Sequence, residues 1–285
     1  MQRNQYIFLG LALLLFVSLY FGGKMVSDKP SKPSNDQHNA GAAAPNAMNP
    51  TASVEPLNII QFIKDESFKI NADGQTKLKG LNEALTKEDN AIHNKDLAEF
   101  WEKEKNLNIA AHYYKKAAFL ENTEKSLTFA GNLFLAILQK TEEPEIRKWQ
   151  SLEGIECLNK ALELNPNNTD TKIDLATCYT EGTGETMKGV TLLREITQSD
   201  STNIPANIIL GKLAIQSGQF DKAIKRLELV MSLRPKNTEA MYFLAEAYKG
   251  SGNKEKALSL FEQCKKEVNN PDFTKEIDEY IKTFK

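Results

Sequence analysis

The amino-acid sequence predicts an all-α fold: a solenoid of stacked helical hairpins, preceded by one transmembrane helix and a disordered linker. Three observations carry this prediction. Small and large apolar residues recur at a fixed interval through the second half of the chain, an uncharged apolar run occupies the N-terminus, and a stretch rich in Pro, Ala and Asn joins the two. The 285 residues carry a net charge of −2. This balance gives no basic field that would favour nucleic acid as a partner.

The N-terminal segment, residues 1–26, is expected to be a membrane anchor. Residues 6–23, YIFLGLALLLFVSLYFGG, contain no charge, and a helix of that length nearly spans the hydrocarbon core of a bilayer. A cleaved signal peptide is the alternative, but it requires small residues at positions −3 and −1 before the cut. A cut after Gly23 would put Phe21 at −3. The sequence therefore favours an uncleaved single span.

The orientation of this span is less well defined by the charges around it. Arg3 precedes the span, whereas Lys24, Lys29 and Lys32 follow it, so the positive-inside rule gives little guidance. Residues 27–56 are rich in Pro, Ala, Asn and Ser and are expected to be a disordered linker. We expect a single-pass protein of the bacterial inner membrane with the folded part in the periplasm; a cytoplasm-facing orientation stays open.

The repeat is clearest between residues 204 and 271. Leu210, Gly211 and Ala214 are followed 34 residues later by Leu244, Ala245 and Tyr248. Ala223 and Leu227 are followed at the same interval by Ala257 and Phe261. A fixed period of this length is typical of a solenoid of helical pairs.

This pattern resembles the tetratricopeptide repeat: L-G-x-x-Y on a first helix, A-x-x-x-F-x-x-A on a second helix, and then Pro. The resemblance covers residues 91–270 and implies about five units. The unit at 124–168 carries an insertion at residues 140–151, KTEEPEIRKWQS, which is expected to lengthen both of its helices. Residues 57–90 lack the signature and are expected to form a helical pair that acts as a degenerate cap. The predicted units are 91–123, 124–168, 169–203, 204–237 and 238–271.

The types of residue in the repeat have a packing explanation. Small residues such as Gly211 and Ala223 occupy the points where two helices cross, and large residues fill the hollow beside each crossing. Pro235 ends a second helix. Residues 271–285 are expected to form a closing helix, because Ile277, Tyr280, Ile281 and Phe284 fall on one face and charges on the other.

The resemblance also implies where a partner would bind, because first helices of the family line a concave groove. Mapped onto this chain, the groove is charged in its N-terminal half, at Lys95 and Glu99, and apolar in its C-terminal half. An exposed apolar strip with a polar rim is typical of a surface that binds peptides or helices. The Lys/Asn/Arg clamp with which some relatives hold a C-terminal carboxylate is missing here. The predicted groove residues are Ile173, Thr177, Ile208, Lys212, Tyr242, Phe243 and Glu246.

The sequence offers no constellation for catalysis, a metal or a cofactor. His38, His93 and His112 have no acidic or thiol partner at ligand spacing. The glycine-rich stretch 181–189, EGTGETMKG, lacks the Gly-Lys-Ser/Thr order of a phosphate-binding loop and is interpreted as an enlarged turn. We therefore expect neither a small-molecule substrate nor a cofactor.

The three cysteines fit neither a disulfide framework nor a metal site. Cys264 takes the place of a small core residue. Cys157 and Cys178 lie on neighbouring predicted helices and could form a bridge in an oxidising compartment, a question that the sequence leaves open.

Two functions from different classes therefore stand, and an enzyme has no support. The first is a non-enzymatic, membrane-tethered scaffold that mediates protein–protein interaction in the cell envelope, similar in plan to anchored repeat proteins of secretion, cytochrome maturation or envelope assembly. The second is a periplasmic holdase that uses the apolar strip for many exported clients. A cytoplasm-facing inner-membrane adaptor is a variant of the first.

Overall fold

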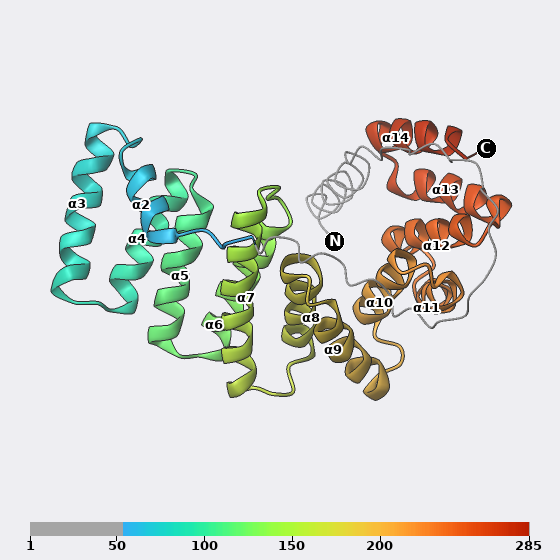
Figure 1. Cartoon of the computed structure of the whole chain (residues 1–285), viewed down its shortest axis with the longest axis horizontal. Coiled ribbons are helices and arrows are strands. Elements are labelled where there is room, and N and C mark those ends of the chain that lie inside the picture. Colours follow the sequence, from blue (N-terminus) through green and yellow to red (C-terminus); the bar gives the residue numbers. More distant parts are fainter. Residues whose placement is uncertain (1–53, 285) are drawn as a thin grey trace, which may run out of the picture. The chain divides into compact units, whose positions relative to one another are not determined.

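The computed structural model describes residues 54–284, which are entirely helical apart from their turns (Figure 1). The described part contains thirteen α-helices and one π-helical turn, and no strand, so the all-α prediction is confirmed. The predicted anchor at 1–26 and most of the predicted linker at 27–56 lie outside the described residues. None of the helices between residues 54 and 284 has the length and hydrophobicity that a membrane crossing requires.

Each of the five predicted units contains two helices. The helices are α4 (Ala91–Lys103) with α5 (Leu107–Glu121), α6 (Glu124–Leu138) with α7 (Pro144–Leu164), α8 (Thr169–Cys178) with α9 (Thr186–Ser199), α10 (Ile204–Gln216) with α11 (Phe220–Leu233), and α12 (Thr238–Gly250) with α13 (Lys254–Val268). Within each pair the two helices pack against one another, and each second helix packs against the first helix of the next unit. This order of contacts is that of a repeat array.

Three further helices lie at the two ends of the array. At the N-terminal end are the short α2 (Ile59–Ser67) and α3 (Ala72–Lys87), of which α3 packs on α4. At the C-terminal end α14 (Pro271–Lys282) packs on α13. The insertion at 140–151 lengthens mainly α7, which has 21 residues against 14 in α11, while α6 has 15 against 13 in α10.

Most helices begin with an asparagine that caps the N-terminus. At ten starts a polar side chain accepts a hydrogen bond from the backbone N–H two or three residues later, which satisfies a donor that the helix itself leaves free. Nine of the ten are asparagines, a signal that the repeat pattern alone did not reveal. The capping residues are Asn58, Asn71, Asn90, Asn106, Thr123, Asn168, Asn203, Asn237, Asn253 and Asn270.

Crossings between helices place small residues where the sequence expected them. A methyl group built on Gly131 would lie 2.6 Å from Leu158, and one built on Gly211 would lie 2.9 Å from Leu227. Both leucines are fully buried. The turns within the units at 204–237 and 238–271 use Gly218 and Gly252, whose φ angles of 71° and 84° favour a residue without Cβ.

Candidate functional site

The first helices α8, α10 and α12 carry the C-terminal part of the predicted groove. α8 contacts α10 and α10 contacts α12, so side chains at equivalent turns form a row across the three helices. Ile173, Ile208 and Tyr242 occupy such turns, at intervals of 35 and 34 residues. The structure therefore supports neighbouring positions for these three side chains.

Their exposure differs from the sequence expectation. Ile173 is 8% exposed, Ile208 and Tyr242 are 5% exposed, and Phe243 and Glu246 are also buried. The Tyr242 ring lies edge-on to Phe243 and to Phe261 of α13, with ring centroids 5.5 and 5.6 Å apart. The expected exposed apolar strip is therefore not present in this structure: Ile173 and Ile208 are buried, and Tyr242 and Phe243 pack as aromatic rings against their neighbours. Whether they contact a protein partner stays a prediction.

Thr177 and Lys212, the other two predicted groove residues, are partly exposed. The Thr177 hydroxyl donates to the carbonyl of Ile173 one turn earlier, at 2.9 Å. Lys212 donates to the Glu181 carboxylate at 2.7 Å, and its side chain is 16% exposed. These two residues are the predicted groove positions that a partner could reach without rearrangement.

Glu181 belongs to a π-helical turn, Tyr179–Thr183, that follows α8 directly. Its backbone carbonyl accepts a hydrogen bond from Arg147 of α7 at 2.9 Å, while its carboxylate accepts from Lys212 of α10. The glycine-rich stretch 181–189 is thus more than an enlarged turn, because it links three successive units. The turn ends at Gly184, whose φ of 73° again favours glycine.

Glu246 is the one acidic side chain of the predicted groove that is buried. One of its carboxylate oxygens lies 3.3 Å from Nζ of Lys249. Burial raises the pKa of Glu246, and the nearby ammonium group of Lys249 opposes that shift. Lys249 also lies 4.2 Å from the ring centroid of Tyr280 on α14. This pair therefore helps to hold the closing helix on the last unit.

The described residues offer no metal site, and their three thiols are buried. Residues 54–284 contain no cluster of three or more His, Cys, Asp or Glu that could hold a metal ion. Cys157, Cys178 and Cys264 are free thiols, and burial raises the pKa of each to about 12, so they are protonated at neutral pH. The possible bridge between Cys157 and Cys178 is not formed in this structure.

The two described histidines have structural contacts. Nδ1 of His93 lies 2.8 Å from the backbone carbonyl of Glu88. Burial lowers the pKa of His112 to about 4, with smaller contributions from Lys116 and Lys115, so this imidazole is neutral at pH 7. His38 lies outside the described residues.

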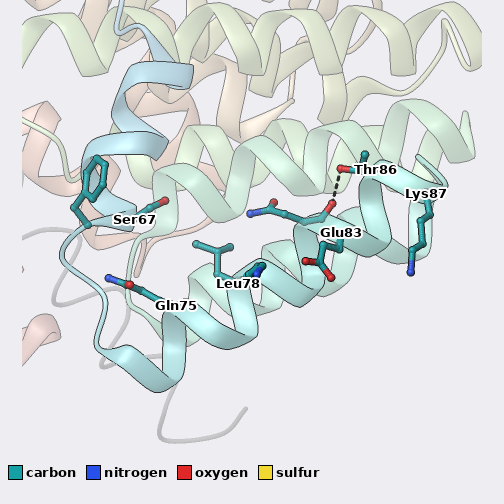
Figure 2. Close-up of a pocket in the computed structure, with 9 residues that line it drawn as sticks. Ser67, Gln75, Leu78, Glu83, Thr86 and Lys87 are labelled. Atoms are coloured by element: carbon teal, nitrogen blue, oxygen red, sulfur yellow. Dashed lines mark hydrogen bonds between the residues drawn. The ribbon is translucent and has the colours of Figure 1, made fainter.

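Sequence reasoning missed a groove of about 730 Å³ beside α3. Ser67 and Phe68 at the end of α2 and one side of α3, from Gln75 to Lys87, form its walls. In Figure 2, Leu78 projects from α3 toward the end of α2 that carries Ser67. Phe68 is 71% exposed. The sequence signal that could have indicated this groove was a large apolar residue, Phe68, in the short turn before the Asn71 N-cap.

Comparison with known proteins identifies the repeat. A tetratricopeptide repeat family model matches residues 214–274. Anaphase-promoting complex subunit 3 of Dictyostelium discoideum is 31% identical over 86 residues, which are 30% of this chain and 9% of that protein. The matched part is thus under a tenth of that relative's length.

Two solved structures are similar to this chain at low sequence identity. PilW, a widely conserved type IV pilus biogenesis factor, is 14% identical with a TM-score of 0.50, over 76% of this chain and 94% of PilW. MamA from Desulfovibrio magneticus RS-1, residues 41 to its end, is 16% identical with a TM-score of 0.48, over 64% of this chain and 97% of that one. The family match and the recurring helical pairs show that residues 214–274 of this chain are tetratricopeptide repeats.

Proposed function

We propose that the chain is a membrane-tethered scaffold of the cell envelope that binds a protein partner through its first helices and catalyses no reaction. The observation that carries the proposal is the row of equivalent turns on α8, α10 and α12. On α8 and α10 the partly exposed Thr177 and Lys212 lie one helical turn after the buried Ile173 and Ile208, and the buried Tyr242 holds the equivalent turn of α12. A row of this kind, repeated from unit to unit, can follow an extended peptide or one face of a helix.

The tether is supported by the sequence alone. An uncharged run of 18 residues at 6–23 is followed by the Pro- and Ala-rich residues 27–56. A flexible linker of that length would hold the repeats at about millimolar effective concentration near other membrane proteins. Weak contacts with the row would then be sufficient for a specific complex.

A topology reporter placed within residues 27–56 tests the compartment. Activity of an exported reporter such as alkaline phosphatase supports the envelope-facing orientation. Activity of a reporter that functions in the cytoplasm supports the inner-membrane adaptor that faces the other way, and it rules out the envelope role.

Site-specific photo-crosslinking in cells tests the row itself. The crosslinking residue is placed at Thr177 or Lys212, because charged or bulky substitutions at the buried Ile208 and Tyr242 would also reduce stability. The matched control position is Lys225, which is exposed on the second helix α11. One dominant adduct at the row and none at the control supports a scaffold. A smear of many adducts supports a holdase instead, and equal adducts at all positions would contradict binding by the row.

A further inference from the structure

One face of α3 is uncovered by the other described helices. Leu78 is the single buried residue of α3, whereas Asp73, Thr76, Gly80, Glu83 and Lys87 are exposed. These five are spaced by three and four residues in alternation, which places them on one stripe of the helix. The groove beside Phe68 borders the same helix (Figure 2). The stripe is therefore available to a partner along the whole of α3.

Gly80, in the middle of this stripe, has no internal role. Every other glycine inside a described helix or the π-helical turn would bring an added methyl group within 3.3 Å of a neighbouring atom, whereas Gly80 has nothing within 4 Å. A glycine inside a helix costs about 1 kcal/mol relative to alanine. In this molecule, helical glycines such as Gly131 and Gly211 mark the points where helices approach closely. Gly80 is likewise a glycine inside a helix, but no atom of another described helix approaches it.

Two charges at the ends of this stripe are placed symmetrically about Gly80 and are opposite in sign. Asp73 lies seven residues before Gly80 and Lys87 seven after it, which is about two helical turns in each direction, so both share the face of Gly80. Both are exposed, and neither forms an ion pair with another residue of the described part. A second α3 that runs antiparallel and crosses at Gly80 would face each of these two charges with its opposite.

We propose that α3 is a self-association face on which two copies of this chain pair about a two-fold axis at Gly80. Asp73 of one copy faces Lys87 of the other, and the symmetry repeats this contact, which gives two ion pairs. The missing Cβ at Gly80 lets the two backbones approach. The same surface patch serves both copies, as a closed two-fold dimer requires.

The exposed Phe68 gives the dimer an apolar contact at each end. Phe68 precedes the N-terminus of α3, and the antiparallel arrangement brings the C-terminus of the second α3 to that end. Ile92, which is 68% exposed, follows the C-terminus of α3 by five residues. The pairing is nevertheless mainly polar, so it is weak and sensitive to salt. Anchoring in one membrane would concentrate the copies and favour it.

Sedimentation velocity of the full chain in a mild detergent tests the proposal. We expect a reversible dimer at about 20 mM NaCl that dissociates at about 500 mM, because salt screens exposed charges. Lys87→Glu should weaken association at least about tenfold, a change of about 1.4 kcal/mol. The double variant Asp73→Lys/Lys87→Glu should restore it, since each new charge again faces its opposite. Glu195→Lys, an equally exposed change on α9, is the matched control.

Gly80→Ala separates association from folding. It should weaken the dimer while it raises the melting temperature of the monomer, because the methyl group meets nothing within the chain. A chain that stays monomeric at low salt, a dimer that Lys87→Glu does not weaken, or a double variant that fails to restore association would overturn the proposal. So would a crosslinker at Thr76 that captures a different protein while the chain is monomeric, since a foreign helix would then be the occupant.

Discussion

The two ends of the array are closed in different ways. At the C-terminal end, α14 buries Phe273, Ile277, Tyr280 and Ile281 against the last unit. Two lysines reinforce it: Nζ of Lys265 lies 2.5 Å from Asp278, and Nζ of Lys249 lies over the Tyr280 ring. The outer face of α14 is charged, as a terminal helix that ends an array requires.

At the N-terminal end, α3 buries Leu78 and leaves its charges unpaired within the described residues. Its partner α2 has nine residues, against thirteen in α4, and none of them is buried. Both α3 and α14 thus present polar surfaces to water. A polar outer face is therefore not by itself a complete cap. The inner face of α14 is packed and its lysine contacts are made within the chain, whereas α3 carries a glycine, a groove and two opposite charges that form no ion pair with the described residues.

The largest expected effect concerns how firmly each end is held. Phe273→Ala should cost about 3–5 kcal/mol, because the ring is 1% exposed and its removal leaves a cavity. Leu78→Ala should cost about 2 kcal/mol, since Leu78 borders an open groove that water already reaches. Urea unfolding gives the totals, and native-state hydrogen exchange assigns each loss to an end of the array. Equal losses at the two ends would contradict the difference described here.

Much of the fold could be predicted because the repeat depends on local patterns. Period, small crossing residues and Pro235 located the helical pairs, and the helices begin within a few residues of the predicted units. The asparagine caps were equally readable from the sequence, since Asn precedes most helices, but a repeat signature does not include them. Helix order and packing therefore followed from information that lies within about 34 residues.

The candidate site was less predictable, because exposure depends on all neighbours at once. Ile208 and Tyr242 have the spacing of groove residues, yet their burial is set by side chains on other helices, such as Phe261. The link from Arg147 through Glu181 to Lys212 crosses three units. No pattern within one unit indicates it. The exposed face of α3 was missed because the repeat pattern marks residues that pack within the chain, and this face makes no such contact.

Lowering the pH should destabilise the folded chain through His112 on α5. The pKa of His112 is about 4 in the folded chain and about 6.5 when unfolded. The unfolded chain therefore binds a proton that the folded chain excludes, so stability falls as the pH drops from about 6.5 through about 4. The loss should be about 3 kcal/mol at pH 4. His112→Gln should flatten this part of the stability profile, measured by urea unfolding at pH 7 and pH 4. If the variant keeps the pH dependence of the original chain, folding does not lower the pKa of His112.

The smallest and sharpest test compares two glycines with identical substitutions. Gly131→Ala should destabilise the chain by about 1–3 kcal/mol, because the added methyl group would lie 2.6 Å from Leu158, which is fully buried. Gly80→Ala should instead stabilise the monomer by up to about 1 kcal/mol, since alanine favours the helix and nothing lies within 4 Å. Thermal unfolding at high salt, where self-association is screened, measures both. The opposite signs test the inference that helical glycines mark crossings in this chain and that the crossing at Gly80 involves a helix from outside the folded monomer. A loss of monomer stability in Gly80→Ala would mean that α3 already packs against its own chain at that position.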